Sequence, residues 1–467
     1  MEEVDVLELY ELHYSDLVLL SSLSASECDV LVSSTEDQTR LETIRRTVVE
    51  TLGPEGSGLL SITGVPNASL LRRNLLPLAR DLALLDNDRR KNVLKEHNLG
   101  GDVPLKNPDR SVSSFAMQLK YAEALESAPG KPNQGIHLHS ISEETQIHLD
   151  VDKVGNIQGG KFDNLANAFK ELGYCMMELG LRLAQICDDF IGGKELERSL
   201  LESGTAKGRL IHYHSVLDNL LMKEYGRRRR STKEQATSKE DKAKCLGNKQ
   251  KQLQVVKSTT NNNKTGSCLN YSDLWQQWHY DYGIFTVLTA PMFLSSSYSS
   301  ENMEKDHFIS SCDQECTYPN GHSYLQIFDP KKNNVVMVKT SPESFIIQVG
   351  ESADILSKGK LKSTLHSVCR PLNSENISRE TFVVFLQPSW NKTFTISDYA
   401  GEHCKSVDHL SSKGNGDVEQ DSNDFSQDIL KIIPPLWSRL KEGMTFAEFS
   451  RETTKQYYGG SGLQSNR

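Results

Sequence analysis

The feature that most constrains the fold is a series of short apolar runs in the second half of this 467-residue chain. Many of the runs are rich in β-branched or aromatic residues, and Gly, Pro and Asn separate them, a pattern typical of short strands joined by turns. The runs cover residues 209–212, 283–290, 324–328, 335–339, 345–349, 362–368 and 381–387. The series predicts an all-β barrel or a double-sheet jelly roll.

Helical patterns flank this β region. Apolar residues recur at spacings of three and four over residues 162–200, which predicts one long amphipathic helix. Its apolar stripe consists of Leu165, Phe169, Leu172, Met176, Leu179, Leu183, Ile186 and Phe190. Residues 69–96 also show a helical pattern, whereas residues 16–20 and 59–63 have the pattern of short strands.

The C-terminal part of the chain is expected to return to helix. Thr445 is followed three residues later by Glu448, the signature of a capping box at a helix start. The whole chain therefore divides into four predicted regions. They are a mixed α/β region at 1–205, a β domain at 206–395 with insertions at 227–264 and 293–323, a polar linker at 396–424, and a helical segment at 425–467.

Charge is distributed unevenly. The chain has 53 Lys and Arg against 62 Asp and Glu, a net charge of −9, so it is not expected to bind nucleic acid or another polyanion as a whole. Residues 227–264 hold 12 basic and 3 acidic residues, a local charge of +9, with few large apolar residues. This composition predicts a disordered insertion. Arg227–Arg230 is alternatively a nuclear-import signal or a contact for an anionic partner.

The chain shows no targeting or membrane signal. It has no run of 18 apolar residues, and its acidic N-terminus lacks the basic and apolar regions of a secretory signal. Nine cysteines form no dense framework, which favours reduced thiols. We therefore expect an intracellular protein without a membrane span, located in the cytoplasm with the nucleus as an alternative.

The chemically informative residues lie in the β region. His279 and Asp281 are two apart, so on a strand both side chains point to the same face and reach one cation. His366 is the candidate third ligand, and two imidazoles with one carboxylate form the facial triad of non-haem Fe(II) oxygenases. His148 and Asp150 repeat the H-x-D spacing, but no suitable strand and arginine follow them.

Arg379 supports the first set of ligands. It follows His366 by 13 residues and immediately precedes an apolar strand pattern. A guanidinium buried at the start of such a strand needs an anionic partner, because an unpaired buried charge is costly. A dicarboxylate cosubstrate would provide that partner through a bidentate pair. The alternative is that Arg379 pairs with a carboxylate of the protein itself, such as Glu380.

These motifs resemble a known family. HYDYGIFT at 279–286 resembles the H-x-D-x-G-x-x-T signature of the 2-oxoglutarate- and Fe(II)-dependent dioxygenases, in the isopenicillin N synthase-like branch. The segment 341–368 looks like that branch's distal-histidine region, with Glu351 where the family usually has Asp. RETFVVFLQP at 379–388 looks like its Arg-x-Ser strand, with Thr381 in place of Ser. GSGLLSITGVP at 56–66 resembles its N-terminal strand.

The resemblance implies both a fold and a set of roles. The fold would be a double-stranded β-helix, a jelly-roll variant that is mainly β with flanking helices. His279, Asp281 and His366 would bind Fe(II), and Arg379 with Thr381 would hold the distal carboxylate of 2-oxoglutarate. A family tyrosine that contacts this cosubstrate falls on Tyr213 or on His214, because GRLIHYHS matches its strand only loosely.

The insertion at 293–323 lengthens the interval between Asp281 and His366 to 85 residues. Its N and S ligands are His307, Cys312, Cys316 and His322. They permit a small zinc site, although a loop with free thiols is the default because the ligand spacing is irregular.

The sequence therefore predicts an Fe(II)- and 2-oxoglutarate-dependent oxygenase that uses O2 and releases succinate and CO2. We expect it to oxidise a small organic substrate, with hydroxylation as the default outcome and desaturation or ring closure as variants. Two other readings stay open. One is an Fe(II) oxidase that does not use 2-oxoglutarate, and the other is a non-catalytic binding or scaffold protein on the same fold.

Overall fold

The structure is a computed structural model that describes most of the chain. The described residues are 5–25, 35–101, 105, 110–127, 160–224, 274–295, 314–371, 375–395 and 433–458. The predicted basic insertion at 227–264, with Arg227–Arg230, and the polar linker at 396–424 lie outside them. So do His148, His307 and Cys312. Among the described helices, none is both long and apolar enough to cross a membrane.

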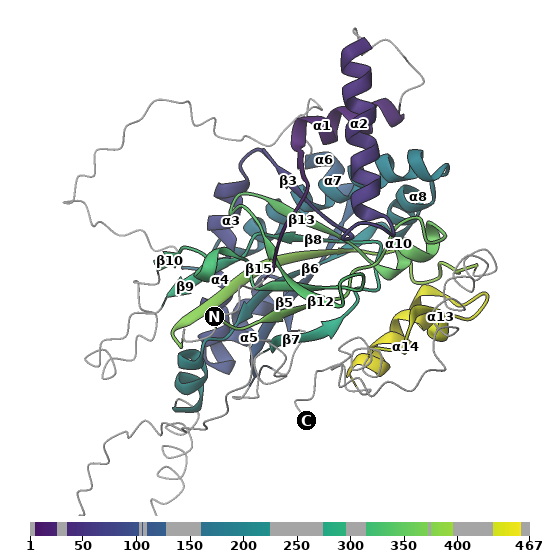
Figure 1. Ribbon diagram of the computed structural model, residues 1–467. Coiled ribbons are helices and arrows are strands. Elements are labelled where there is room, and N and C mark those ends of the chain that lie inside the picture. Colours follow the sequence, from purple (N-terminus) through teal and green to yellow (C-terminus); the bar gives the residue numbers. More distant parts are fainter. Residues whose placement is uncertain are drawn as a thin grey trace, which may run out of the picture.

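The described strands form two sheets (Figure 1). The smaller sheet has five strands in the order β1 (Val6–Glu8), β12 (Asn334–Lys339), β11 (Leu325–Asp329), β14 (His366–Cys369) and β7 (Leu274–His279). The main path of the larger sheet is β2 (Glu11–His13), β3 (Leu59–Thr63), β13 (Phe345–Val349), β8 (Phe285–Thr289), β15 (Ile377–Leu386), β6 (Thr205–Tyr213), β5 (Val112–Lys120) and β4 (Gly100–Gly101). It is completed by β9 (Met292–Ser295), which pairs with β15, and by β10 (Gln314–Cys316), which pairs with β9.

An apolar core joins the faces that the two sheets turn toward each other. It combines Trp275, Leu325, Ile327 and Val368 of the smaller sheet with Ile211, Ile346 and Val383 of the larger one. The molecule is therefore mainly β with a double-sheet core of jelly-roll type, as the sequence predicts. The strands make two separate sheets and do not close into one barrel.

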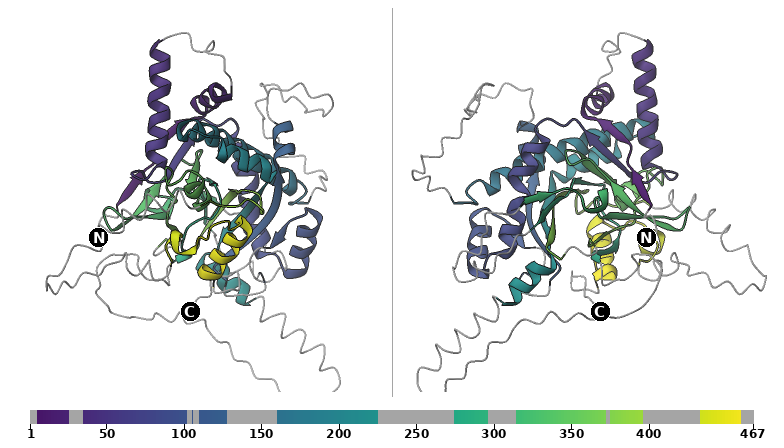
Figure 2. Two further views of the ribbon diagram at one scale, coloured as in Figure 1. Left: turned by 90° about the vertical axis from the view of Figure 1, so that its right-hand side faces the viewer. Right: turned by 60° about the vertical axis from the view of Figure 1, so that its left-hand side comes forward.

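The outer face of the larger sheet is covered by helices, as the two views of Figure 2 show. The central one is α7 (Leu165–Ile191), which packs on β5, β6, β8 and β15. Its approach to the sheet is close: a Cβ added at Gly180 would lie 2.0 Å from Leu386 Cδ1. The absence of a side chain at Gly180 thus allows this helix to pack closely against the strands that carry the site.

The single helix predicted over 162–200 is in fact two helices. α7 ends at Ile191 because Gly192 adopts a left-handed φ of 86°, and α8 (Glu195–Ser203) begins after it. The apolar stripe of α7 is buried except for its last member, Phe190, which is 49% exposed at the helix end. Periodicity located the stripe correctly but could not detect the stop at the Gly-Gly pair.

The strand expected at residues 16–20 is wrong, because these residues belong to α1 (Tyr14–Ala25). Leu17 and Leu20 are both fully buried, and their spacing of three places them on one helical face. The predicted strand at 59–63 is β3, with the same bounds. The helical pattern at 69–96 comprises three helices, α3 (Ala68–Leu75), α4 (Pro77–Leu84) and α5 (Asn87–Glu96).

Further helices are α2 (Thr35–Leu52), α6 (Tyr121–Ser127), α10 (Glu351–Leu356), the short 3₁₀ helix η3 (Pro319–Gly321), α13 (Leu436–Arg439) and α14 (Phe446–Tyr458), and residues 216–224 are helical as well. The predicted capping box at the start of α14 is present. Glu448 N donates to Thr445 Oγ1 at 3.3 Å, and Thr445 N donates to Glu448 Oε2 at 2.9 Å.

Strands from the N-terminal region and from the β region share one sheet. β3 pairs with β13, and β5 pairs with β6 along nine residues, so the region 1–205 contributes strands next to the site-bearing ones. Residues of the predicted insertion 293–323 contribute to β9, β10 and η3.

Candidate metal and cosubstrate site

The three predicted ligands converge between the sheets. His279 ends β7 and His366 begins the neighbouring strand β14, where the two residues are direct cross-strand partners. Asp281 follows two residues after His279. Its Oδ1 lies 3.8 Å from His279 Nε2, and its Oδ2 lies 3.8 Å from His366 Nε2. All three side chains are buried, and one ligand atom of each lies within 4.8 Å of the others.

Both imidazoles are oriented through their second nitrogen. His279 Nδ1 donates to the carbonyl of Gln277 at 2.7 Å, and His366 Nδ1 donates to the carbonyl of Thr364 at 3.1 Å. With the proton on Nδ1, each ring directs its Nε2 lone pair toward Asp281. Burial, followed by the nearby His366, lowers the pKa of His279 to about 4, so this imidazole is neutral near pH 7, as a metal ligand must be.

The carboxylate of Asp281 is held by two donors. Thr286 Oγ1 donates to Asp281 Oδ2 at 2.7 Å, and Gln348 Nε2 donates to the same oxygen at 3.3 Å. Thr286 lies on β8 and Gln348 on β13, so two adjacent strands of the larger sheet reach across to the ligand. The threonine of the H-x-D-x-G-x-x-T pattern therefore has a direct structural role.

The loop that carries Asp281 is packed too closely for side chains at its glycines. A Cβ added at Gly350 would lie 2.3 Å from the Gly283 carbonyl oxygen, and Glu351 N donates to the Asp281 carbonyl at 2.8 Å. The backbone segment 281–283 and the backbone at Gly350 and Glu351 therefore pack directly against each other.

This donor set fits a divalent iron ion. Two imidazole nitrogens and one carboxylate on one side of a cation leave further coordination positions free, which is the facial arrangement of non-haem Fe(II) sites. The second atoms of all three ligands are already hydrogen-bonded, the usual condition of a metal-binding side chain.

Arg379 lies on the face of the larger sheet that is turned toward the three predicted metal ligands. It is 3% exposed, its Nε donates to the Ser323 carbonyl at 3.1 Å, and its guanidinium carbon lies 5.1 Å from the centre of the Tyr213 ring. Burial lowers the pKa of Arg379, although a guanidinium stays charged near pH 7. No carboxylate in the described part of the chain lies within 4.0 Å of its nitrogens.

Glu380, the alternative partner that the sequence suggested for Arg379, faces away from it. Glu380 points to the opposite side of β15, where its carboxylate is 2.9 Å from His212 Nδ1. Arg379 is thus a buried cation in need of an anion, and the terminal carboxylate of 2-oxoglutarate fits that need.

Tyr213 and Thr381 both join Arg379, whereas His214 does not. Tyr213 is the cross-strand partner of Arg379, and its hydroxyl donates to Gln276 Oε1 at 2.8 Å. Thr381 follows two residues after Arg379 on the same face, and its hydroxyl donates to the Thr289 carbonyl at 3.4 Å. His214 lies on the other face of β6, against Ser113.

Three further residues of the site were not singled out from the sequence. Gln276 Nε2 lies 2.9 Å from His279 Nε2, and Gln348 contacts both Asp281 and His366. Tyr318, from the insertion 293–323, has a buried hydroxyl without a hydrogen bond, and burial raises its pKa to about 12. Glutamine and tyrosine at these positions carry no recognisable sequence signal, because only strand pairing brings them to the ligands.

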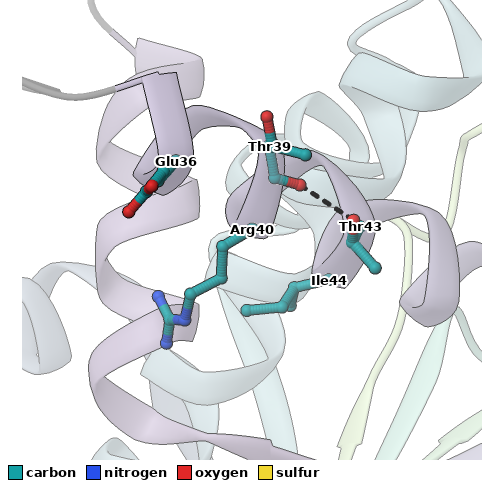
Figure 3. A pocket seen from close by; sticks show the side chains of 5 residues that line it. All are labelled: Glu36, Thr39, Arg40, Thr43 and Ile44. Carbon is teal, nitrogen blue, oxygen red and sulfur yellow. Dashed lines mark hydrogen bonds between the residues drawn. The ribbon is translucent and has the colours of Figure 1, made fainter.

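A surface pocket lies on α2, apart from these residues (Figure 3). It is lined by Glu36, Thr39, Arg40, Thr43 and Ile44, all from that one helix. Its hydrogen bond from Thr43 Oγ1 to the Thr39 carbonyl is an ordinary contact within a helix, and Arg40 is engaged by Asp16 at 2.6 Å. None of the lining residues belongs to the predicted site.

Comparison with solved structures finds remote likenesses. A full-length Neurospora crassa protein crystallised with alpha-KG and 5-formyluracil is 13% identical, with a TM-score of 0.48 over 98% of this chain and 99% of that one. The rice dioxygenase for auxin oxidation is 13% identical, with a TM-score of 0.41 over 80% and 92%. For dioxygenase for auxin oxidation 1 of Arabidopsis thaliana, bound to 2-oxoglutarate, the values are 13%, 0.39, 82% and 94%. Scores this low support no conclusion about the present chain.

Comparison with family models gives a specific result, although no curated protein matches the chain. Residues 293–388 match the model of the 2OG-Fe(II) oxygenase superfamily. The matched segment includes His366, Arg379 and Thr381 and begins after His279 and Asp281. Members of this superfamily are oxidoreductases that use Fe(II), 2-oxoglutarate and O2, and the isopenicillin N synthase-like branch is consistent with the match. The segment that carries His366, Arg379 and Thr381 is therefore similar to the 2OG-Fe(II) oxygenase superfamily.

Proposed function

We propose that this oxygenase hydroxylates a small organic molecule, with Fe(II) held by His279, Asp281 and His366. Arg379 and Thr381 would hold the distal carboxylate of 2-oxoglutarate, with Tyr213 beside it. The supporting observation is a chain of contacts: Arg379 stacks on Tyr213, the Tyr213 hydroxyl bonds Gln276, and the Gln276 amide reaches the iron-facing nitrogen of His279. The unpaired cation and the metal ligands therefore border the same space.

Each group has a distinct task in this proposal. When bound, Fe(II) together with 2-oxoglutarate and O2 supplies the oxidising power, and succinate and CO2 are released. The three ligands fix the ion and leave the remaining positions to the reactants. Arg379 sets the orientation of the cosubstrate, because its planar guanidinium can donate two parallel hydrogen bonds to one carboxylate. The buried setting of all these residues excludes bulk water.

The proposal of a small substrate rests on two points. The isopenicillin N synthase-like branch, which the motifs resemble, acts mainly on small metabolites. The ligands also lie deep between two sheets, with 5% exposure for each histidine and 9% for Asp281. A buried site of this kind suits a molecule that can enter the space between the sheets more than it suits a folded macromolecule.

The two other readings are less well supported. An oxidase independent of 2-oxoglutarate has no use for a buried arginine whose nitrogens have no carboxylate among the described residues. A scaffold protein has no need for three buried ligands whose second atoms are all anchored.

Succinate release by the purified full chain, supplied with Fe(II), O2 and 2-oxoglutarate, tests the proposed activity. Uncoupled turnover is expected even before the substrate is known, and candidate substrates should raise its rate. His279→Ala, Asp281→Ala and His366→Ala should each abolish iron binding and succinate release. His148→Ala is the matched control, since His148 starts the other H-x-D, and it should retain both. Full iron occupancy in Asp281→Ala would refute the ligand assignment.

A further inference from the structure

A second cluster of buried polar residues lies behind the cosubstrate strands, on the outer face of the larger sheet. The strands β15, β6 and β5 lie side by side, and α4 covers them there (Figure 1). The cluster consists of Arg80 from α4, Ser113 from β5, His212 from β6, His214 and Asp218 just after β6, and Glu380 from β15. None of these side chains has a role in the site described above.

Three atoms of this cluster are suited to coordinate a metal. His212 Nε2 and His214 Nδ1 are buried and make no hydrogen bond. Asp218 Oδ2 lies 3.5 Å from His212 Nε2, and one ligand atom of each of the three residues lies within 4.8 Å of the others. Ligands about 2.0–2.1 Å from a tetrahedral zinc ion are roughly 3.3–3.4 Å apart, so the His212–Asp218 spacing already approaches that geometry.

The other polar atom of each candidate ligand is anchored. His212 Nδ1 lies 2.9 Å from a Glu380 carboxylate oxygen, which forms the carboxylate–histidine pair common behind metal ions. His214 Nε2 lies 2.8 Å from Ser113 Oγ. Arg80 binds Asp218 Oδ1 through Nη2 at 2.8 Å and Nε at 3.2 Å. His212 and His214 are thus each held by one nitrogen while the other is directed at a common point. Asp218 Oδ2 lies beside them and also accepts a hydrogen bond from Ser215 N at 2.9 Å.

We propose that His212, His214 and Asp218 bind a second divalent metal ion, of the zinc class, in a structural site distinct from the iron site. A solvent molecule would complete a tetrahedral set. The ion would tie β6 to the helix at residues 216–224 that follows it, directly behind Tyr213, and Glu380 would connect it to β15 behind Arg379. The sequence suggested a zinc site elsewhere, in the insertion 293–323.

That insertion offers a weaker alternative in the structure. Cys316 Sγ donates to the Phe293 carbonyl, and the His322 ring packs against Tyr324. Among the residues that the structure describes, neither belongs to a group of three metal-ligating side chains. His307 and Cys312 lie outside the described residues, so the two zinc sites must be separated by experiment.

Zinc content of full-length Asp281→Ala decides between them, because this substitution disables the iron site. The protein is stripped with chelator, reloaded with Zn²⁺, desalted and analysed for metal per chain. We expect one zinc per chain, reduced toward none when His214→Gln is added. Cys312→Ser with Cys316→Ser, the matched control in the same background, should keep its zinc. A Co²⁺-loaded sample should show the visible spectrum of tetrahedral nitrogen and oxygen ligands.

A milder substitution guards against misfolding of the His214 variant. Ser113→Ala removes the hydroxyl that anchors His214 and that also accepts from Arg110 Nε at 2.8 Å. Loss of such an anchor typically weakens metal binding about 10–100-fold. The unfolding temperature of each variant, with and without Zn²⁺, shows whether it is folded. The proposal is overturned if folded Asp281→Ala retains no zinc and gains no thermal stability from it. It is also overturned if the cysteine control loses the zinc.

Discussion

At the residue scale, the carboxylate of Asp281 in the proposed iron site is held by two side chains. Thr286, five residues later in the chain, folds back from β8 so that its hydroxyl meets Asp281 Oδ2 at 2.7 Å. The side chain of Gln348 meets the same oxygen from β13. The position of this side chain is therefore set by two hydrogen bonds.

We predict that Thr286→Ala weakens iron binding by about 10–100-fold, the usual effect of losing a residue that orients a ligand. Thr286→Ser keeps the hydroxyl and should retain nearly full affinity. Competition with an iron chelator measures both variants against the unaltered chain. Equal affinity in the alanine variant would show that Asp281 does not depend on this hydrogen bond.

At the scale of elements, a buried ion pair attaches the C-terminal helices to the edge of the site. Arg439 of α13 binds Glu351, the first residue of α10, through both of its terminal nitrogens. Neither side chain is more than 1% exposed. Burial raises the pKa of Glu351, and the guanidinium opposes this shift. The glutamate that replaces the family's usual aspartate thus serves as a tether for the C-terminal segment.

We predict that Arg439→Met lowers the free energy of unfolding by about 3–5 kcal/mol, because it leaves the Glu351 carboxylate buried without its partner. The double variant Glu351→Gln with Arg439→Met removes both charges and should recover a large part of this loss. Denaturant unfolding of the two variants provides the comparison. If the double variant is no more stable than the single one, the loss comes from packing and not from the unpaired charge.

A second element-scale feature is the junction between α7 and α8. Asp188 of α7 accepts hydrogen bonds from Leu196 N at 3.1 Å and Glu197 N at 2.8 Å, in the first turn of α8. Burial raises the pKa of Asp188 to about 6, with the two backbone donors opposing the shift. The folded chain consequently holds a proton on Asp188 that the unfolded chain releases near pH 4.

The pH dependence of stability follows from this raised pKa. Between about pH 4 and pH 6 the folded state binds more protons at Asp188 than the unfolded state does, so the contribution of Asp188 falls as the pH rises. We predict that the stability of the unaltered chain relative to Asp188→Asn decreases from pH 4 to pH 6.5. Urea unfolding of both proteins at each pH measures it. A difference that stays constant would contradict the raised pKa.

At the scale of the whole molecule, the site depends on strands that are far apart in sequence. β3 and β5, from the first 120 residues, pair with strands from the second half of the chain. Short apolar runs located β13 with its exact bounds and overlapped β6, β8, β14 and β15, but none of them covered β7, which carries His279. Their order in the sheets was not predictable, because pairing depends on contacts between distant segments.

The site residues also divide into those that the sequence could predict and those that depended on strand pairing. His279, Asp281, His366 and Arg379 were predicted from the sequence because residue type, spacing and strand context combine into a recognisable pattern. The choice between Tyr213 and His214 needed the register, since adjacent residues of one strand face opposite sides. The helix at 16–20 was missed because packing against α7, a tertiary effect, overrides the local strand-like pattern.

The central claim is that iron and 2-oxoglutarate meet at the triad and Arg379. Its most direct test is an anaerobic titration of Fe(II)-loaded protein with 2-oxoglutarate, followed by the charge-transfer absorbance of the iron. Loss of one partner of a buried charge pair costs about 3–5 kcal/mol, roughly two to four decades in affinity. Arg379→Ala should therefore weaken 2-oxoglutarate binding at least about a hundredfold with iron binding nearly unchanged, and Arg379→Lys should recover only part of it. Unchanged 2-oxoglutarate affinity in Arg379→Ala would contradict the account.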